Sequence, residues 1–183
     1  MNLPYLLASL PHLMFETPAP LRAEAFLTAC REQLSEDHAK TAVALLRGEP
    51  NQTPCARAWT EYENDVRDAV AKRRLARKKV AGASCSQTTP RERDVPATLL
   101  FEIESAFQSA DPLARDTALD RLRWRKAEEM EGLDPMSRDA LFAYAVKLRI
   151  SLRRAAMTRE AGLAALDTIC GTPLPAGVAG LEN

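Results

Sequence analysis

The sequence predicts an all-α fold of roughly seven helices packed as antiparallel hairpins. Alanine, leucine, arginine and glutamate are abundant, and these side chains lose little rotamer freedom in a helix. Apolar residues recur at three- and four-residue intervals, and no segment shows convincing β-strand alternation. With 46% hydrophobic residues in 183, the chain can bury one sizeable core, so we expect a single helical domain over 1–170 and a flexible C-terminal tail over 171–183.

The first elements are separated by proline, serine and glycine signals. The segment 5–10 fits a short helix and a short extended stretch equally well. A helix over 21–34 follows two prolines, and the next helix begins after Ser35 and ends at Gly48. Thr53 and Pro54 then fit an N-cap followed by proline at the first helical position, which opens the longest helix of the chain.

The second half of the chain repeats these start and stop signals. Small and polar residues over 82–90 predict an exposed loop. Aspartate followed by proline, at 111–112 and again at 134–135, marks two helix starts, and Gly132 ends the helix between them. The second of these helices has apolar residues on two sides, which predicts a central, enclosed position. The helices expected in this half cover 96–109, 112–131, 135–157 and 158–170.

The longest helix has the most informative pattern, because it should be buried at one end only. Its apolar stripe begins with Trp59, Tyr62 and Val66 and is interrupted by Arg73. We therefore expect its second half to protrude toward water or a partner, as in an adaptor or stalk protein. The cations that we assign as candidate partner-binding residues are Arg67, Lys72, Arg73, Arg74, Arg77, Lys78 and Lys79.

Two other interpretations of this basic helix, Arg67 to Lys79, stay open. Its cations could follow a phosphate backbone, which would make the chain a helical nucleic-acid-associated protein. They could also be a solvated helix end that complements the helix dipole. The formal net charge of zero and the absence of aromatic residues within the cluster favour a solvated helix end or a protein contact over nucleic acid.

The sequence contains no recognisable catalytic constellation. It has neither a glycine-rich phosphate loop nor a Gly-x-Ser-x-Gly turn. Paired carboxylates, such as Asp116 with Asp120, are interpreted as solvated ion-pair faces on arginine-rich helices. Neither histidine follows a glutamate by three residues, as a carboxylate di-metal bundle would require. We therefore expect no enzyme, no cofactor and no metal site, and free thiols at Cys30, Cys55, Cys85 and Cys170.

Four blocks of residues, in order along the chain, form a further pattern. The first lies at 5–13 and includes Tyr5, Leu10 and Pro11; the second contains Trp59, Tyr62, Glu63, Arg67 and Arg73; the third contains Asp111, Asp120, Arg123 and Trp124; the fourth contains Tyr144, Lys147, Arg149 and Arg153. This ordered set resembles an uncharacterised bacterial family whose genes accompany the subunits of V/A-type rotary ATPases.

The resemblance implies a cytoplasmic protein peripheral to the inner membrane, with other rotary ATPase subunits as its partners. The place it suggests is that of the central-stalk adaptor, the helical protein seated between the membrane rotor ring and the central stalk. An assembly or regulatory role is the other possibility that the resemblance leaves open. No segment approaches the roughly twenty apolar residues that cross a bilayer, so we expect membrane association only through partners.

Overall fold

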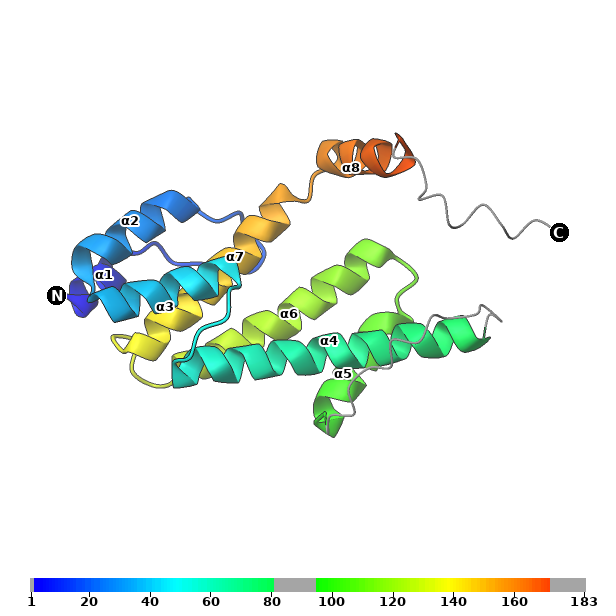
Figure 1. Ribbon diagram of the computed structural model, residues 1–183, viewed down its shortest axis with the longest axis horizontal. Helices are drawn as coiled ribbons and strands as arrows, with labels where there is room; N and C mark the ends of the chain where they lie inside the picture. The colour runs from blue at the N-terminus through cyan, green and yellow to red at the C-terminus, as the bar shows by residue number, and fades with distance from the viewer. Residues whose placement is uncertain (1, 81–94, 172–183) are drawn as a thin grey trace.

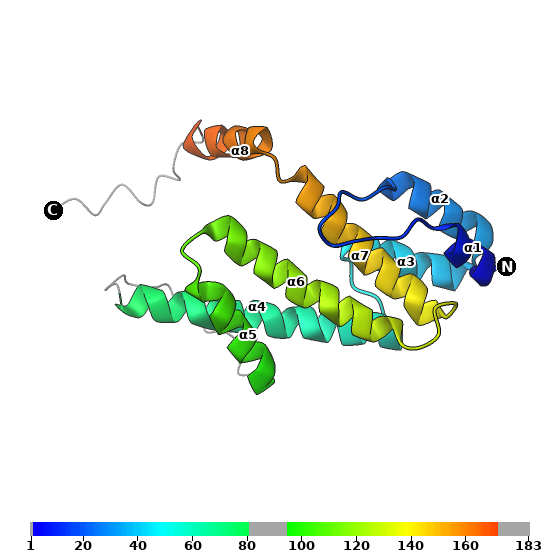
Figure 2. The same cartoon turned by 180° about the vertical axis from the view of Figure 1, so that it is seen from behind.

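The computed structural model describes residues 2–80 and 95–171, and in these ranges the chain forms eight helices and no strand. The all-α prediction is confirmed, with one helix more than the approximate number expected. The loop expected over 82–90 and the tail beyond Gly171 lie outside the described residues. Figures 1 and 2 show the helices from two opposite sides.

The N-terminal helices begin and end at local capping signals. Helix α1 (Leu3–Ser9) starts after Asn2, whose Oδ1 accepts a hydrogen bond from the backbone N–H of Tyr5 at 3.2 Å, and this settles the segment as helical. Helices α2 (Ala23–Gln33) and α3 (Glu36–Arg47) follow. Ser35 caps α3 by accepting from the N–H of His38 at 3.4 Å, and Gly48 ends it with a φ of 73°. Both ends of α3 are as predicted.

The middle helices are α4 (Pro54–Val80), α5 (Ala97–Gln108) and α6 (Pro112–Glu131). Asp111 caps α6 as predicted, because its carboxylate accepts from the backbone N–H groups of Leu113 at 3.0 Å and Ala114 at 3.2 Å. The predicted cap at Thr53 is wrong in one respect. Helix α4 begins at Pro54, but the Thr53 hydroxyl is buried without a hydrogen-bond partner among the described residues.

Helix α7 (Arg138–Ala156) begins three residues later than predicted. The Asp134 carboxylate accepts from the backbone N–H of Met136 at 2.9 Å, so it closes a turn instead of capping a helix. Ser137 is the actual N-cap and accepts from the N–H of Ala140 at 3.0 Å. The predicted central position is confirmed, since α7 is buried on two sides and packs against α2, α3, α4 and α6.

The described residues form two hydrophobic cores. The larger contains residues of α1, α2, α3 and α7 with the first turns of α4 and the end of α6. The smaller joins the middle of α4 to α5 and the first half of α6, around Val66, Ile103 and Leu119. Tyr62 of α4 packs against both. Helix α4 is therefore held by the larger core at its start and by the smaller one along its middle, and Figure 1 shows its last turns extending beyond α5 and α6.

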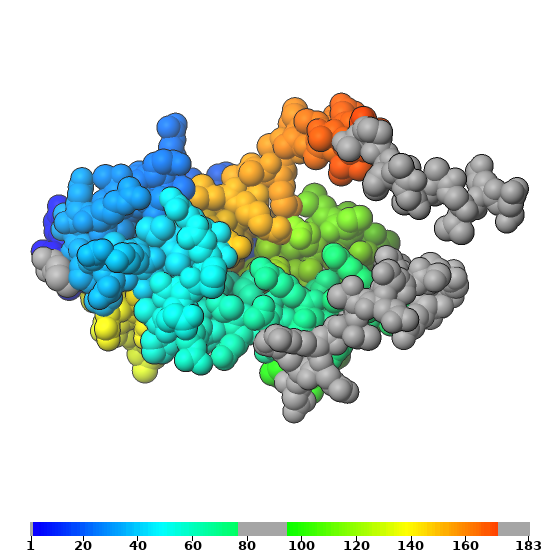
Figure 3. Space-filling view, in the orientation of Figure 1, coloured from blue at the N-terminus to red at the C-terminus, as the bar shows by residue number. Residues whose placement is uncertain are grey.

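The last helix, α8 (Arg159–Gly171), buries none of its residues. Its Leu163, Leu166 and Ile169 are all exposed. The Thr158 hydroxyl accepts from the backbone N–H of Ala161 at 3.1 Å, which caps the helix at the predicted start. Figures 1 and 3 show α8 standing away from the other helices, joined to them through the end of α7.

Removing residues 158–183 should therefore change stability little. We expect the truncated chain to lose less than about 1 kcal/mol, because the described part of the removed segment, 158–171, is exposed throughout and changes at exposed groups usually stay within such limits. The melting temperature would then fall by less than about 4 °C for a chain of this length. Thermal unfolding followed by circular dichroism measures this. A larger fall would mean that α8 packs on the other helices in solution.

Candidate functional site

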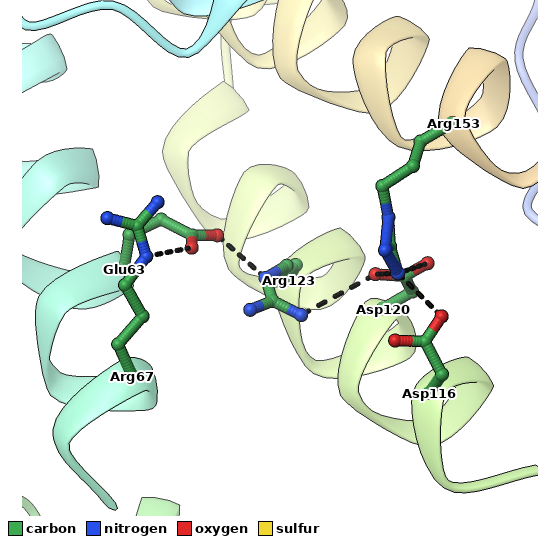
Figure 4. Close-up of polar contacts among 6 residues, drawn as sticks. All are labelled: Glu63, Arg67, Asp116, Asp120, Arg123 and Arg153. Carbon is green, nitrogen blue, oxygen red and sulfur yellow. Dashed lines mark hydrogen bonds and ion pairs between the residues drawn. The ribbon is translucent and has the colours of Figure 1, made fainter. Parts of the chain in front are cut away.

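A charged network of Glu63, Arg67, Asp116, Asp120, Arg123 and Arg153 connects α4, α6 and α7 (Figure 4). At its centre is Asp120 of α6, a carboxylate that is only 1% exposed. Its two oxygens accept from Nη2 of Arg153 on α7 at 3.1 and 3.2 Å. Nη1 of Arg123 lies 3.5 Å from the same carboxylate. Asp120 is therefore a buried carboxylate with two cationic partners, one on its own helix and one on α7.

The network continues from Asp120 in two directions. Arg123 donates from Nε to the Glu63 carboxylate of α4 at 2.7 Å, and Glu63 in turn lies 3.9 Å from Nε of Arg67. Arg153 donates a further hydrogen bond to Asp116 at 2.6 Å. Because Glu63 and Arg153 come from helices on either side of α6, these bonds fix both α4 and α7 to it.

The buried position of Asp120 corrects its interpretation as part of a solvated ion-pair face. Burial raises the pKa of Asp120 above the usual aspartate value, and Arg153 is the largest influence in the opposite direction. A sequence signal did exist. Trp124 and Ala127 lie four and seven residues after Asp120 and are both buried, so all three occupy the same inward face of α6.

A cavity of about 300 Å³ lies beside the charged network, between α4, α6 and α7. Its apolar wall comes from both cores and includes Trp59 and Val146 of the larger and Val66 of the smaller. Its carboxylates are Glu63, Asp116 and Asp120. Its cations outnumber them, and they are Arg67, Arg74, Arg123, Arg149 and Arg153. We call this space the arginine cavity.

Arg149 of α7 differs from the other arginines of the cavity in its surroundings. It is half-buried and makes no hydrogen bond or ion pair with the described residues. Burial lowers the pKa of Arg149, while the more distant charge of Glu63 raises it. The guanidinium lies against the turn at Gly48, where an added Cβ would be 2.4 Å from Cζ of Arg149. Arg149 also lines a second hollow, of about 190 Å³, beneath this turn.

The candidate partner-binding cations have unequal surroundings. Lys72 and Arg74 are exposed, as expected. The expectation that Arg73 projects freely is wrong, because its Nε lies 2.7 Å from the Glu104 carboxylate of α5 and its side chain is half-buried. Arg67 points into the charged network (Figure 4). The first half of α4 is buried as predicted, through residues that include Trp59 and Val66. The side chains of Arg77, Lys78 and Lys79 lie outside the described residues.

Residues of the four sequence blocks contact one another across the fold. The Tyr144 hydroxyl donates to the backbone carbonyl of Pro11 at 2.9 Å, which joins the fourth block to the first. Glu63 with Arg123 joins the second to the third, and Asp120 with Arg153 joins the third to the fourth. The other residues of the pattern are also placed by the structure: Lys147 lies over the Trp124 ring at 5.8 Å, Trp59 packs on Tyr62 at 5.8 Å, Leu10 ends α1, and Tyr5 is exposed.

Other reactive groups are distributed without a common centre. Burial raises the pKa of the Cys30 thiol to about 12 and that of the half-buried Cys55 thiol to about 11, while Cys170 is exposed. Cys85 lies outside the described residues. Over 2–80 and 95–171, no three histidine, cysteine, aspartate or glutamate side chains are grouped as metal ligands would be. None of the helices in the same ranges has the length and hydropathy needed to cross a bilayer.

Comparison of the chain with known protein families, curated proteins and solved structures gave no match.

Proposed function

We propose that this chain is a non-catalytic accessory or central-stalk adaptor subunit of a V/A-type rotary ATPase. The observation that supports the proposal most is the set of contacts among the four blocks that resemble an ATPase-associated family. Pro11, Glu63, Arg123 and Tyr144 come from different blocks and form hydrogen bonds with one another in pairs. Pro11 of the first block and Tyr144 of the fourth are 133 residues apart and yet in contact, so these blocks belong to one packed unit. This supports treating the four blocks as a single family pattern.

The geometry suits a mechanical role. The charged network fixes α4 and α7 to α6, and the two cores hold α4 along more than half its length. A protein that transmits torque between a stalk and a membrane ring needs such cross-braced helices, because buried hydrogen-bonded ion pairs resist sliding of one helix past another. The proposed adaptor makes polar and aromatic contacts with its partners and forms or breaks no covalent bond.

The exposed cations of α4 supply a contact surface for an acidic partner. Lys72 and Arg74 are exposed on the part of the helix that lies beyond the larger core. Arg73 is engaged with Glu104, so the described part of the helix does not present its cations as the continuous row that a phosphate backbone would use. This favours an acidic protein surface over nucleic acid, and association should weaken as salt is raised.

The test is copurification of the tagged full-length chain from its native host. We expect ATPase subunits to copurify, and Lys72→Glu to weaken their retention roughly fivefold, since reversing one exposed charge changes binding by about 1 kcal/mol. Arg57→Glu is the matched control, because Arg57 is an exposed cation near the other end of the same helix. Isolation of the chain without any ATPase subunit, in mild detergent and low salt, would refute the proposal. A salt-sensitive gel shift with nucleic acid would favour the alternative.

A further inference from the structure

The arginine cavity contains more positive charge than the fold neutralises. Five arginines and three carboxylates line it, which leaves an excess of two positive charges. Arg123 and Arg153 direct their donors to Glu63, Asp116 and Asp120 at distances of 2.6 to 3.2 Å. The remaining arginines are less engaged, because Arg67 is 3.9 Å from Glu63, while Arg74 and Arg149 form no ion pair within the described residues. The excess is therefore carried by Arg67 and Arg74, which are exposed, and by Arg149, which is half-buried.

Arg149 is the group on which a ligand would depend most. It is half-buried, and its guanidinium fits against the turn at Gly48 because that residue has no Cβ. Arg67, Arg123 and Arg153 are close enough to disfavour its charge, so a cation is held among other cations. A half-buried guanidinium with no carboxylate at ion-pair distance among the described residues has given up part of its hydration, and a bound anion would offset that cost.

We infer that the arginine cavity binds a small, water-soluble phosphate compound through its phosphate group. The planar guanidinium donates paired hydrogen bonds that match phosphate oxygens. A phosphate monoester has a charge of about −1.5 to −2 at pH 7, which nearly balances the excess of two, whereas a single carboxylate would leave half of it.

The volume and the wall of the cavity leave space beyond the phosphate itself. Small-molecule sites usually measure about 300–1,000 Å³, and this cavity, at about 300 Å³, is at the lower end of that range. Trp59 and Val146 offer an apolar wall to the organic part of the ligand. Trp59, which lines both hollows, also has an indole Nε1 that is buried without an acceptor among the described residues. The cavity thus suits a compact phosphorylated metabolite better than a long polymer.

This inference does not rest on the proposed function, since a phosphate site could exist in any helical protein with this cavity. Its experiment uses the isolated full-length chain and no ATPase subunit. Failure of one proposal is therefore visible without failure of the other.

The experiment is calorimetric titration of the full-length chain with inorganic phosphate, pyrophosphate and acetate at constant ionic strength, accompanied by thermal unfolding. We expect saturable binding of phosphate or pyrophosphate, a melting temperature that rises with their concentration, and no such rise with acetate. Arg149→Gln should weaken binding roughly tenfold or more, because it removes a charge-assisted paired donor. Arg149→Lys keeps the charge but not the fork and should also lose affinity.

The matched control is Arg57→Gln, which makes the same charge change on α4 outside the cavity and should bind phosphate as the unaltered chain does. Folding of Arg149→Gln is checked by its circular dichroism spectrum; if it unfolds, Gly48→Ala provides the second test, since its Cβ would displace the Arg149 guanidinium. Equal effects of phosphate on both arginine-to-glutamine variants would overturn the inference. So would absence of binding at millimolar phosphate. A parallel titration with vesicles that contain phosphatidic acid separates a lipid headgroup from a soluble phosphate, and binding to the vesicles alone would also overturn the inference.

Discussion

Replacing Asp120 by alanine should destabilise the fold by about 3 kcal/mol. The carboxylate is 1% exposed and accepts two hydrogen bonds from Arg153, with Arg123 beside it. Breaking a buried ion pair by removing one partner typically costs about 3–5 kcal/mol, because the remaining charge stays desolvated. The lower value applies here, since Arg153 is 44% exposed and keeps Asp116, while Arg123 keeps Glu63. Urea unfolding followed by circular dichroism measures the loss.

Two further variants separate burial from charge. Asp116→Ala removes a more exposed carboxylate that also binds Arg153, and it should cost less than about 1 kcal/mol. Asp120→Asn retains an oxygen acceptor for Arg153. Burial also raises the pKa of Asp120, which means that the site disfavours a negative charge, so a neutral amide of the same size should fit there better than the space left by alanine. It should therefore lose less than Asp120→Ala. Equal losses at 116 and 120 would show that Asp120 is hydrated in solution.

The sequence was sufficient for the features that are decided locally. Ser35 starts α3, Gly48 ends it, and Asp111 starts α6. The capping contacts of these residues reach no further than a few residues along the chain. The start of α7 was mispredicted because two cap candidates compete within four residues. Asp134 closes a turn and Ser137 caps the helix, and both bonds are equally local. Choosing between them required the path of the chain leaving α6.

The site depends on contacts between distant residues, which spacing alone does not reveal. Asp120 meets Arg153 across 33 residues, and Glu63 meets Arg123 across 60. The stripe on α4 predicted that Arg73 ends the buried face, but it could not supply the partner Glu104, which lies on α5. The cavity forms only when α4, α6 and α7 pack together. The excess of arginines around it therefore could not be predicted from the spacing of residues in the sequence.

The second large effect is expected in the larger core, where Phe26→Ala should cost about 3–5 kcal/mol. Phe26 of α2 is 0% exposed, and its ring stacks on Tyr144 of α7 with centroids 5.6 Å apart and planes 26° apart. Alanine would leave a cavity between α2 and α7 in addition to losing the burial of the ring. For a chain of this length, such a loss corresponds to a fall of roughly 10 °C in melting temperature.

Phe101→Ala is the matched control, because it removes the same ring from α5 at a position that is 76% exposed. Its expected cost is within about 0.5 kcal/mol, as for most surface substitutions. Urea titration measures the unfolding midpoint of both variants. If the slope of unfolding free energy against urea concentration is the same as for the unaltered chain, a shift in the midpoint reports a change in stability. Because Tyr144 also donates to Pro11, loss of the Phe26 ring should loosen the segment that joins α1 to α2 as well. If Phe26→Ala proved as mild as Phe101→Ala, α2 would not be packed on α7 as the structure has it, and the contact between the first and fourth blocks would lose its support.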